Sequence, residues 1–243
     1  MTLLDVKDLH TSYGAVNVLA GVSFQVEPGE TYALVGESGS GKTTVIRAIA
    51  GLAPAQSGSV QFDGQEIRGL PERAMRPLRK DIAMMFQDPI GSLSPRLTIR
   101  SLITEAYRIQ GMKDRDLDAE AKRLLAMVNL PAHFADRYPY QLSGGQARRV
   151  GVARALALEP RLILADEPVS NLDPARAESV LTLITGEARK REIGVLFSSH
   201  QPELSLGYSD RVIGLREGAV LFDRASTQVT SDDIGQLYHG ASP

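Results

Sequence analysis

The distribution of apolar and polar positions along the chain predicts short strands alternating with helices. In NVLAGVSFQVEPGE, Val18, Val22, Phe24 and Val26 fall on even positions, which is the period of a strand with one buried face. Short apolar runs predict buried strands at residues 31–36, 82–86, 162–166 and 194–199, and helical spacing predicts helices at 42–53 and 174–190. Turns at 28–29, 63–64 and 217–218 favour hairpins or strand ends.

Residues from about 98 to 158 have a different pattern, with leucine, alanine, methionine and charges at helical spacing. Alternating strands and helices favour an α/β fold with a mixed sheet that is parallel at its centre. We therefore expect one domain, with an antiparallel β part and an inserted helical subdomain. The catalytic core would span about 1–87 and 160–243, and the helical subdomain about 88–159.

Composition narrows the class of protein. The chain has 243 residues and no cysteine, which excludes disulfides and thiolate metal sites. The chain has 27 lysine and arginine residues against 29 aspartate and glutamate residues. A nucleic-acid binder usually has a basic excess, so we expect no nucleic-acid partner. No apolar run approaches 18 residues, so we expect a soluble intracellular protein whose membrane role, if any, comes through partners.

The segment GESGSGKT at residues 36–43 fits G-x-x-x-x-G-K-[ST]. Glycines let successive N–H groups point into one concavity beside a helix start, Lys42 can reach the β and γ phosphates, and the Thr43 hydroxyl can ligate Mg²⁺. A Gly/Ser-rich loop with an incidental lysine is the alternative, and the strand before and helix after favour phosphate binding. The candidate nucleotide-binding residues here are Gly36, Glu37, Ser38, Gly39, Ser40, Gly41, Lys42, Thr43 and Thr44.

Two acidic residues end the apolar run LILADEP at residues 162–168. A carboxylate at the carboxyl end of a buried strand lies at the edge where α/β folds bind ligands. Asp166 is placed to hold Mg²⁺ or its water shell, and Glu167 to orient and deprotonate an attacking water. Two solvated acids at a strand end are the alternative, and the phosphate loop favours chemistry.

A second glycine motif, LSGGQ at residues 142–146, precedes a helical stretch. Ser143, Gly144, Gly145 and Gln146 would expose N–H groups at a helix start, which is an anion site, although a serine cap with a glycine turn has the same sequence. Because residues 36–43 already supply a phosphate site, a second helix start suggests that a second copy of the chain completes the nucleotide site.

Other residues have ordinary interpretations when each is taken alone. His200 and Gln87 are most simply loop residues, and Tyr13 is most simply a surface aromatic. The basic residues Arg73, Arg76, Arg79 and Lys80 favour a solvated helix face over a basic patch, and Arg148, Arg149 and Arg154 favour a single helical face.

In their order and spacing, GESGSGKT, LSGGQ and LILADEP resemble the ATP-binding cassette (ABC) nucleotide-binding subunit over essentially the whole chain. Tyr13 matches the family's adenine-stacking aromatic, and Gln87 matches the glutamine that links Mg²⁺ to the helical subdomain. Residues 170–173 match the loop that crosses the dimer and includes Asp173, and His200 matches the switch histidine that contacts the γ-phosphate.

The resemblance implies a head-to-tail dimer, homo or hetero, with ATP sandwiched between residues 36–43 of one copy and 143–146 of the other. Closure would bring Ser143 and the Gly144 and Gly145 amides onto the γ-phosphate. Glu167 would polarise the water, and hydrolysis would let the halves part. The hydrolytic set is complete, so we expect a competent ATPase.

The segment FQDPIGSLSPRLTI, residues 86–99, resembles peptide, opine and nickel importer ATPases, although Ala147 and Asn171 depart from their pattern. Residues 198–223 are more similar to phosphonate importer ATPases. The resemblance implies a peripheral subunit on the cytoplasmic face of the inner membrane. It would contact two permease subunits through Gln87–Ile99 and work with a substrate-binding protein. A soluble ABC ATPase in a non-transport complex is the alternative, and a P-loop kinase leaves LSGGQ without a role.

Overall fold

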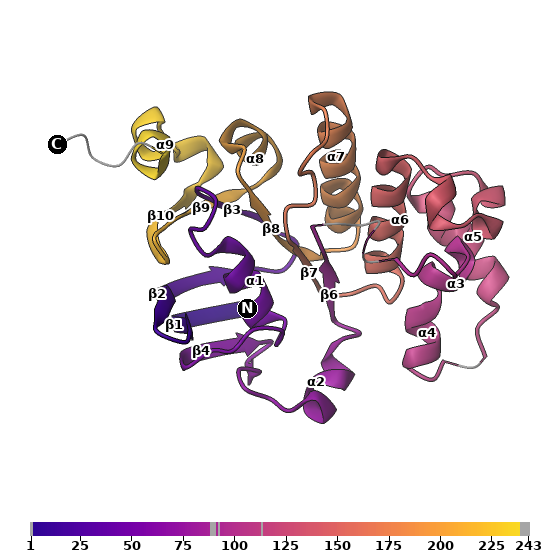
Figure 1. Ribbon diagram of the computed structural model, residues 1–243, viewed down its shortest axis with the longest axis horizontal. Coiled ribbons are helices and arrows are strands. Elements are labelled where there is room, and N and C mark those ends of the chain that lie inside the picture. The colour runs from indigo at the N-terminus through magenta and orange to yellow at the C-terminus, as the bar shows by residue number, and fades with distance from the viewer. Residues whose placement is uncertain (1, 88–90, 92, 113, 239–243) are drawn as a thin grey trace.

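The computed structural model describes residues 2–87, 91, 93–112 and 114–238. At its centre is a sheet with the strand order β10-β9-β3-β8-β7-β6, whose strands are parallel except β10, which pairs antiparallel with β9 (Figure 1). The predicted apolar runs form its interior. Its strands are β3 (Thr31–Val35), β6 (Ile82–Met85), β7 (Leu162–Ala165), β8 (Gly194–Ser199), β9 (Arg211–Arg216) and β10 (Ala219–Ala225).

A second sheet is antiparallel, with the order β2-β1-β4-β5. Val22, Phe24 and Val26 face inward on its β2 strand as predicted. Val18 is only half-buried and Leu19 is buried in its place, because the pairing of β1 with β2 shifts register between Leu19 and Val22. The Asp63-Gly64 turn joins β4 to β5 as predicted, with Asp63 at a φ of 52°. The strands are β1 (Leu4–Tyr13), β2 (Val16–Val26), β4 (Ser57–Phe62) and β5 (Gln65–Glu66).

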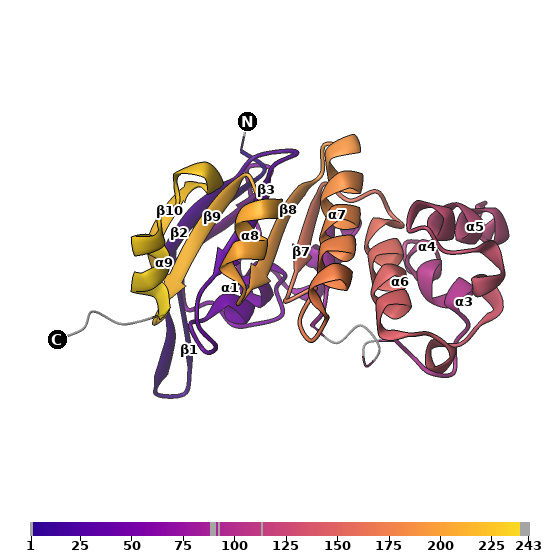
Figure 2. The same ribbon diagram turned by 90° about the horizontal axis from the view of Figure 1, so that it is seen from above.

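Helices cover both faces of the parallel sheet. Helix α1 (Lys42–Ile49) lies between the two sheets, and α7 (Pro174–Lys190) and α8 (Pro202–Tyr208) lie on the opposite face (Figures 1 and 2). Helix α7 has the predicted bounds, whereas α1 ends before residue 53 because Gly51 adopts a left-handed φ of 70°. The remaining elements here are α2 (Glu72–Leu78), the 3₁₀ turn Ser226–Gln228 and α9 (Ser231–Tyr238).

The chain between β6 and β7 forms a helical block at one end of the molecule, beyond α7 (Figure 2). The helical spacing of residues 98–158 predicted it. Its members are α3 (Ile99–Ile103), α4 (Glu105–Ile109), α5 (Leu117–Met127), the 3₁₀ turns Ala132–Asp136 and Pro139–Gln141, and α6 (Gly144–Leu156).

Alternate residues of β3 enter different parts of the core. Tyr32 and Leu34 pack with α1 and the antiparallel sheet, whereas Ala33 and Val35 belong to the core that includes α7 and the helical block. Successive side chains of a strand point to opposite faces, so a continuous apolar run is required where both faces are covered. The helical block is therefore fixed to the sheet by a shared apolar core.

Candidate functional site

Neighbouring strands of the parallel sheet end at one edge, and each end carries a predicted site residue. Strand β3 leads into Gly36, β8 into His200, β7 into Asp166 and β6, through Phe86, into Gln87. These strands are consecutive in the order β3-β8-β7-β6. Residues more than one hundred positions apart therefore meet at the edge where α/β folds bind ligands.

The glycines of the phosphate loop are required by close packing. A Cβ on Gly36 would collide with the carbonyl oxygen of Leu215 on β9. Gly41 has a φ of 104° immediately before α1, and a Cβ there would lie 2.7 Å from Leu19 Cδ2. The loop backbone is thus held close against β9 and β2, at the start of α1. Glu37, Ser38 and Gly39 form its exposed tip, Ser40 is buried, and Thr43 and Thr44 are half-buried in the first turn of α1.

Lys42 is a buried cation at the start of α1. It is 4% exposed, and its Nζ donates to the carbonyl oxygens of Gly36 at 2.8 Å and Glu37 at 2.7 Å. No acidic group of the described residues lies within ion-pair distance of it. Burial lowers the pKa of Lys42, against the opposing effect of Glu167 and Asp166. Phosphate oxygens bound in the loop would supply the missing countercharge.

Asp166 is fully buried and has one oxygen satisfied. Its Oδ1 accepts hydrogen bonds from Thr43 Oγ1 at 2.8 Å and Ser198 Oγ at 3.0 Å. Its Oδ2 has no hydrogen-bond partner among the described residues, and Arg47 Nη2 lies 3.9 Å away. A buried carboxylate oxygen without a donor is costly, and a carboxylate beside a hydroxyl is the oxygen-rich environment that Mg²⁺ prefers. These residues therefore fit a metal ion that would also contact phosphate.

Glu167 follows at the rim of the site, with a side chain 19% exposed. Its Oε2 accepts a hydrogen bond from Gln87 Nε2 at 2.8 Å, and His200 Nδ1 lies 3.8 Å from the same oxygen. Its backbone N–H donates to Ser198 Oγ at 2.8 Å, and its φ of 44° is unusual for a residue with a side chain. The carboxylate is held near solvent beside the phosphate loop, where a general base for water is needed.

Residues 143–146 lie apart from this edge. Ser143 and Gln146 form a reciprocal capping box at the start of α6, with Ser143 N–H on Gln146 Oε1 at 3.0 Å and Gln146 N–H on Ser143 Oγ at 3.3 Å. Among the described residues, no hydrogen bond or ion pair joins 143–146 to residues 36–44. Because the first amides of a helix have no partner within it, Gly144 and Gly145 carry N–H donors that α6 itself does not use.

Asp173 and Tyr13 occupy the two flanks. Asp173 caps α7 by accepting from Arg176 N–H at 3.1 Å, and Arg176 also lies against Gly145. Tyr13 is half exposed at the end of β1, paired with Val16 on β2, the strand whose residue Leu19 packs on the phosphate loop. Both positions are compatible with contacts to nucleotide at the surface.

One functional residue has no signal in the sequence, and one arginine lies elsewhere than predicted. Ser198 bonds to both the Asp166 carboxylate and the Glu167 N–H, but a single serine within an apolar strand belongs to no motif. The expectation of one helical face for Arg148, Arg149 and Arg154 is wrong for Arg148. It is 9% exposed and binds the carbonyls of Pro168 and Ser170, because it lies on the side of α6 that packs against the loop after β7.

A parallel sheet with a phosphate loop, a carboxylate pair at the neighbouring strand ends and an inserted helical block defines a P-loop nucleotide-binding protein. The chain belongs to the ABC transporter family, whose model matches residues 19–170.

Two relatives and one solved structure illustrate the similarity. The chain is 44% identical over 201 residues to the oligopeptide transport ATP-binding protein AppF of Bacillus subtilis, covering 82% of this chain and 61% of that one. It is 37% identical over 247 residues to the phosphonates import ATP-binding protein PhnC of Halobacterium salinarum, covering 98% and 84%. The dimeric ATP-binding cassette MJ0796, bound to ADP and Pi, matches with a TM-score of 0.81 and 29% identity, covering 92% and 98%.

The chain thus spans less than two thirds of the length of the Bacillus relative. The family resemblance predicted from the sequence is confirmed. The two relatives are themselves named as ATP-binding proteins of an oligopeptide transport system and of a phosphonates import system. Within the described residues, no helix is both long and apolar enough to span a bilayer.

Proposed function

We propose that this chain is the ATP-hydrolysing subunit of an ABC importer, working as a head-to-tail dimer. One observation carries the proposal: the phosphate loop, the buried carboxylate and the rim glutamate meet at one sheet edge, while no hydrogen bond or ion pair among the described residues joins residues 143–146 to that loop. A dimer in which each copy completes the other's site gives both features a role. The names of the relatives support import, with peptide or phosphonate as candidate cargo, and do not favour a non-transport complex. Opine and metal chelate remain candidate cargo from the sequence resemblance of residues 86–99.

In the proposed site, the triphosphate lies on the N–H groups of residues 36–44, with Lys42 neutralising the β and γ phosphates. Tyr13 stacks on the adenine. Ser143, Gly144, Gly145 and Gln146 of the second copy close over the γ-phosphate, and Asp173 lines the interface.

Thr43 and Asp166 would hold Mg²⁺, with Gln87 beside them, because Asp166 Oδ2 is buried without a donor among the described residues. When bound, Mg²⁺ would neutralise charge on the phosphates.

The chain's own residues then prepare the attack by water. Glu167 accepts the proton from the water, since its carboxylate is partly exposed and is oriented by the Gln87 amide. His200, 3.8 Å from the same carboxylate, holds the γ-phosphate and reports its loss. Loss of the γ-phosphate removes the group that bridges the copies, and they separate.

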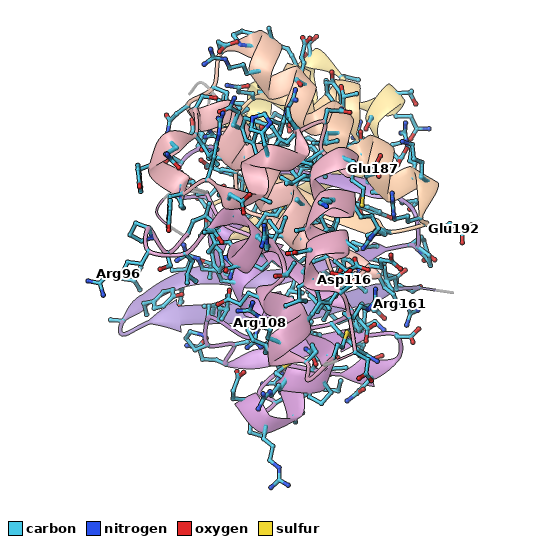
Figure 3. The ribbon with its side chains drawn as sticks, turned by 90° about the vertical axis from the view of Figure 1, so that its right-hand side faces the viewer. Arg96, Arg108, Asp116, Arg161, Glu187 and Glu192 are labelled. Atoms are coloured by element: carbon cyan, nitrogen blue, oxygen red, sulfur yellow. The ribbon has the colours of Figure 1, made fainter. Side chains whose placement is uncertain are left out.

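The partners in this proposal are a second ABC ATPase subunit, two permease subunits and a substrate-binding protein, on the cytoplasmic side of the membrane. The permease contact would use Gln87–Ile99. Residues 88–90 and 92 of this segment lie outside the described residues. Arg96 in the same segment is exposed, and its side chain projects outward at the left edge of the view in Figure 3. The division into a core (about 1–87 and 160–243) and a helical subdomain (about 88–159) belongs to the same proposal.

Two variants test separately whether Glu167 is needed for hydrolysis and whether Ser143 acts on the nucleotide of the second copy. Glu167→Gln should bind ATP, lose turnover at least about a hundredfold and form an ATP-dependent dimer in light scattering. Ser143→Arg should bind ATP as a monomer yet lose hydrolysis on a similar scale. Ser57→Arg, which alters an exposed serine of β4, is the matched control and should keep activity.

A mixture decides where Ser143 acts. In a dimer of one Ser143→Arg copy and one Lys42→Met copy, both defects fall in the same composite site. The other composite site is formed by unchanged residues, so the dimer should still hydrolyse ATP there. No turnover in the mixture, combined with lost ATP binding by the Ser143→Arg monomer, would contradict the shared site. Unchanged turnover in Glu167→Gln would remove Glu167 as the base.

A further inference from the structure

Arg148 lies where α6 meets the loop that follows β7. Its side chain is 9% exposed, its Nε donates to the carbonyl oxygen of Pro168 at 3.2 Å, and its Nη2 donates to that of Ser170. A guanidinium cannot lose its charge in a protein, so burying it is favourable only where several acceptors surround it. The two carbonyls supply part of that environment.

The loop bound by Arg148 has an uncommon backbone conformation. Glu167 has a φ of 44° and Asn171 a φ of 59°, so a left-handed residue lies on each side of the segment that Arg148 contacts. Such conformations in residues with side chains cost free energy and persist only where neighbouring structure holds them. Ser170 N–H donates to Glu167 O at 3.2 Å, which closes a turn between them. The rigid, planar fork of an arginine can fix two carbonyls at once.

The other end of the contact is the first turn of α6. Arg148 is four residues after Gly144, so the two share a helix face, and a Cβ on Gly144 would lie 3.9 Å from Arg148 Nη1. One side chain therefore joins residues 143–146 to the loop that begins with Glu167 and ends at Asp173.

We propose that Arg148 is a positioning residue that couples the start of α6 to the loop between Glu167 and Asp173. This inference rests on the proposed function, because it joins groups that would act on two different nucleotides of the dimer. When the start of α6 moves onto the partner's γ-phosphate, Arg148 moves the Pro168 and Ser170 peptides with it. Glu167 is thereby set in place for its own nucleotide.

Neighbouring arginines provide the comparison. Arg154, in the last turn of the same helix, pairs with Glu105 on α4 at 2.9 Å, inside the helical block. Its loss would weaken the block without reaching the loop. Arg154→Met is therefore the matched control for Arg148→Met. A third variant, Arg148→Lys, keeps the positive charge but lacks the planar guanidinium that can bind two carbonyls at once.

Three measurements test the coupling: the Kd for ATP of the monomer, kcat and KM for ATP, and amide hydrogen exchange of the nucleotide-free protein. In Arg148→Met we expect the Kd and KM to stay within about twofold and kcat to fall at least about tenfold. Amide exchange should accelerate at residues 169–172 and not in α1 or α5. Arg148→Lys should restore part of kcat, and Arg154→Met should keep kcat within about threefold.

Several results would overturn the proposal. It is wrong if kcat of Arg148→Met matches that of Arg154→Met, or if exchange rises equally throughout the helical block. If Arg148→Met does not fold, Arg148→Lys carries the same comparison, and wild-type kcat and exchange in it would refute the coupling. The Glu167→Gln dimer distinguishes the two proposals. If that dimer forms while Arg148 has no effect, only the coupling fails; if no dimer forms with ATP, the shared site fails.

Discussion

Ser198 holds the two acidic residues of the site with one hydroxyl. It is fully buried on β8, donates to Asp166 Oδ1 at 3.0 Å and accepts from the Glu167 N–H at 2.8 Å. The change Ser198→Ala removes both bonds and adds no bulk. It leaves Asp166 with Thr43 as the remaining donor to Oδ1, and it leaves the Glu167 amide without this acceptor.

The cost follows from these bonds. Losing a hydrogen bond to a charged group and leaving a peptide N–H without its acceptor each cost on the order of 1–3 kcal/mol, so we expect a total of about 2–6 kcal/mol. For a chain of 243 residues this corresponds to a fall in Tm of roughly 4–24 °C. Turnover should fall at least about tenfold because Glu167 loses its anchor, while ATP binding through Lys42 should persist.

Calorimetry and steady-state ATP hydrolysis measure the two effects. Ser205→Ala is the control, since Ser205 is equally buried and its hydroxyl donates to the carbonyl of Gln201, the residue before α8. Its loss should cost about 1 kcal/mol with turnover unchanged. If Ser198→Ala costs no more than Ser205→Ala, or hydrolyses ATP at the wild-type rate, then Ser198 does not organise the acidic pair.

Two further outcomes follow from the phosphate loop. Gly36→Ala should lower the free energy of unfolding in urea by at least about 3 kcal/mol, because its Cβ would meet the Leu215 carbonyl. Gly39→Ala is the control, since a Cβ there has open space, and an equal loss in both variants would contradict this reasoning. Burial lowers the pKa of Lys42 below its usual 10.5, so below that pH the unfolded chain binds more protons. The free energy of unfolding of the nucleotide-free wild type, relative to Lys42→Met, should therefore rise with pH just below 10.5, and a flat or falling difference in paired urea titrations would refute it.

The elements of the fold follow from local sequence patterns. The continuous apolar runs predicted β3, β7 and β8 because a strand covered on both faces has no polar position, and the bounds of α7 and β8 agree with the prediction. The phosphate loop Gly36–Thr43 was recognisable for a similar reason. Its conformation depends on glycines a few residues apart, so the residues that would bind phosphate all lie in one short segment.

Contacts between distant segments were beyond such patterns. Gln87 and Glu167 are 80 residues apart, and their hydrogen bond exists because β6 and β7 are neighbours in the sheet. Without the family resemblance, Gln87 and His200 had no more weight than other loop residues. Ser198 had no signal at all, since a strand serine becomes informative only when the carboxylates beside it are known.

The sequence by itself determined the strands, the helices, the phosphate loop and the acidic pair, because each depends on residues close together in the chain. The tertiary structure alone decided which strand ends meet, that residues 143–146 lie away from their own phosphate loop, and that Arg148 is buried against the Pro168 and Ser170 carbonyls. Strand order and the direction of a helix face are set by packing of the whole core. The same α6 sequence is compatible with Arg148 in solvent until the sheet and α7 are placed beside it.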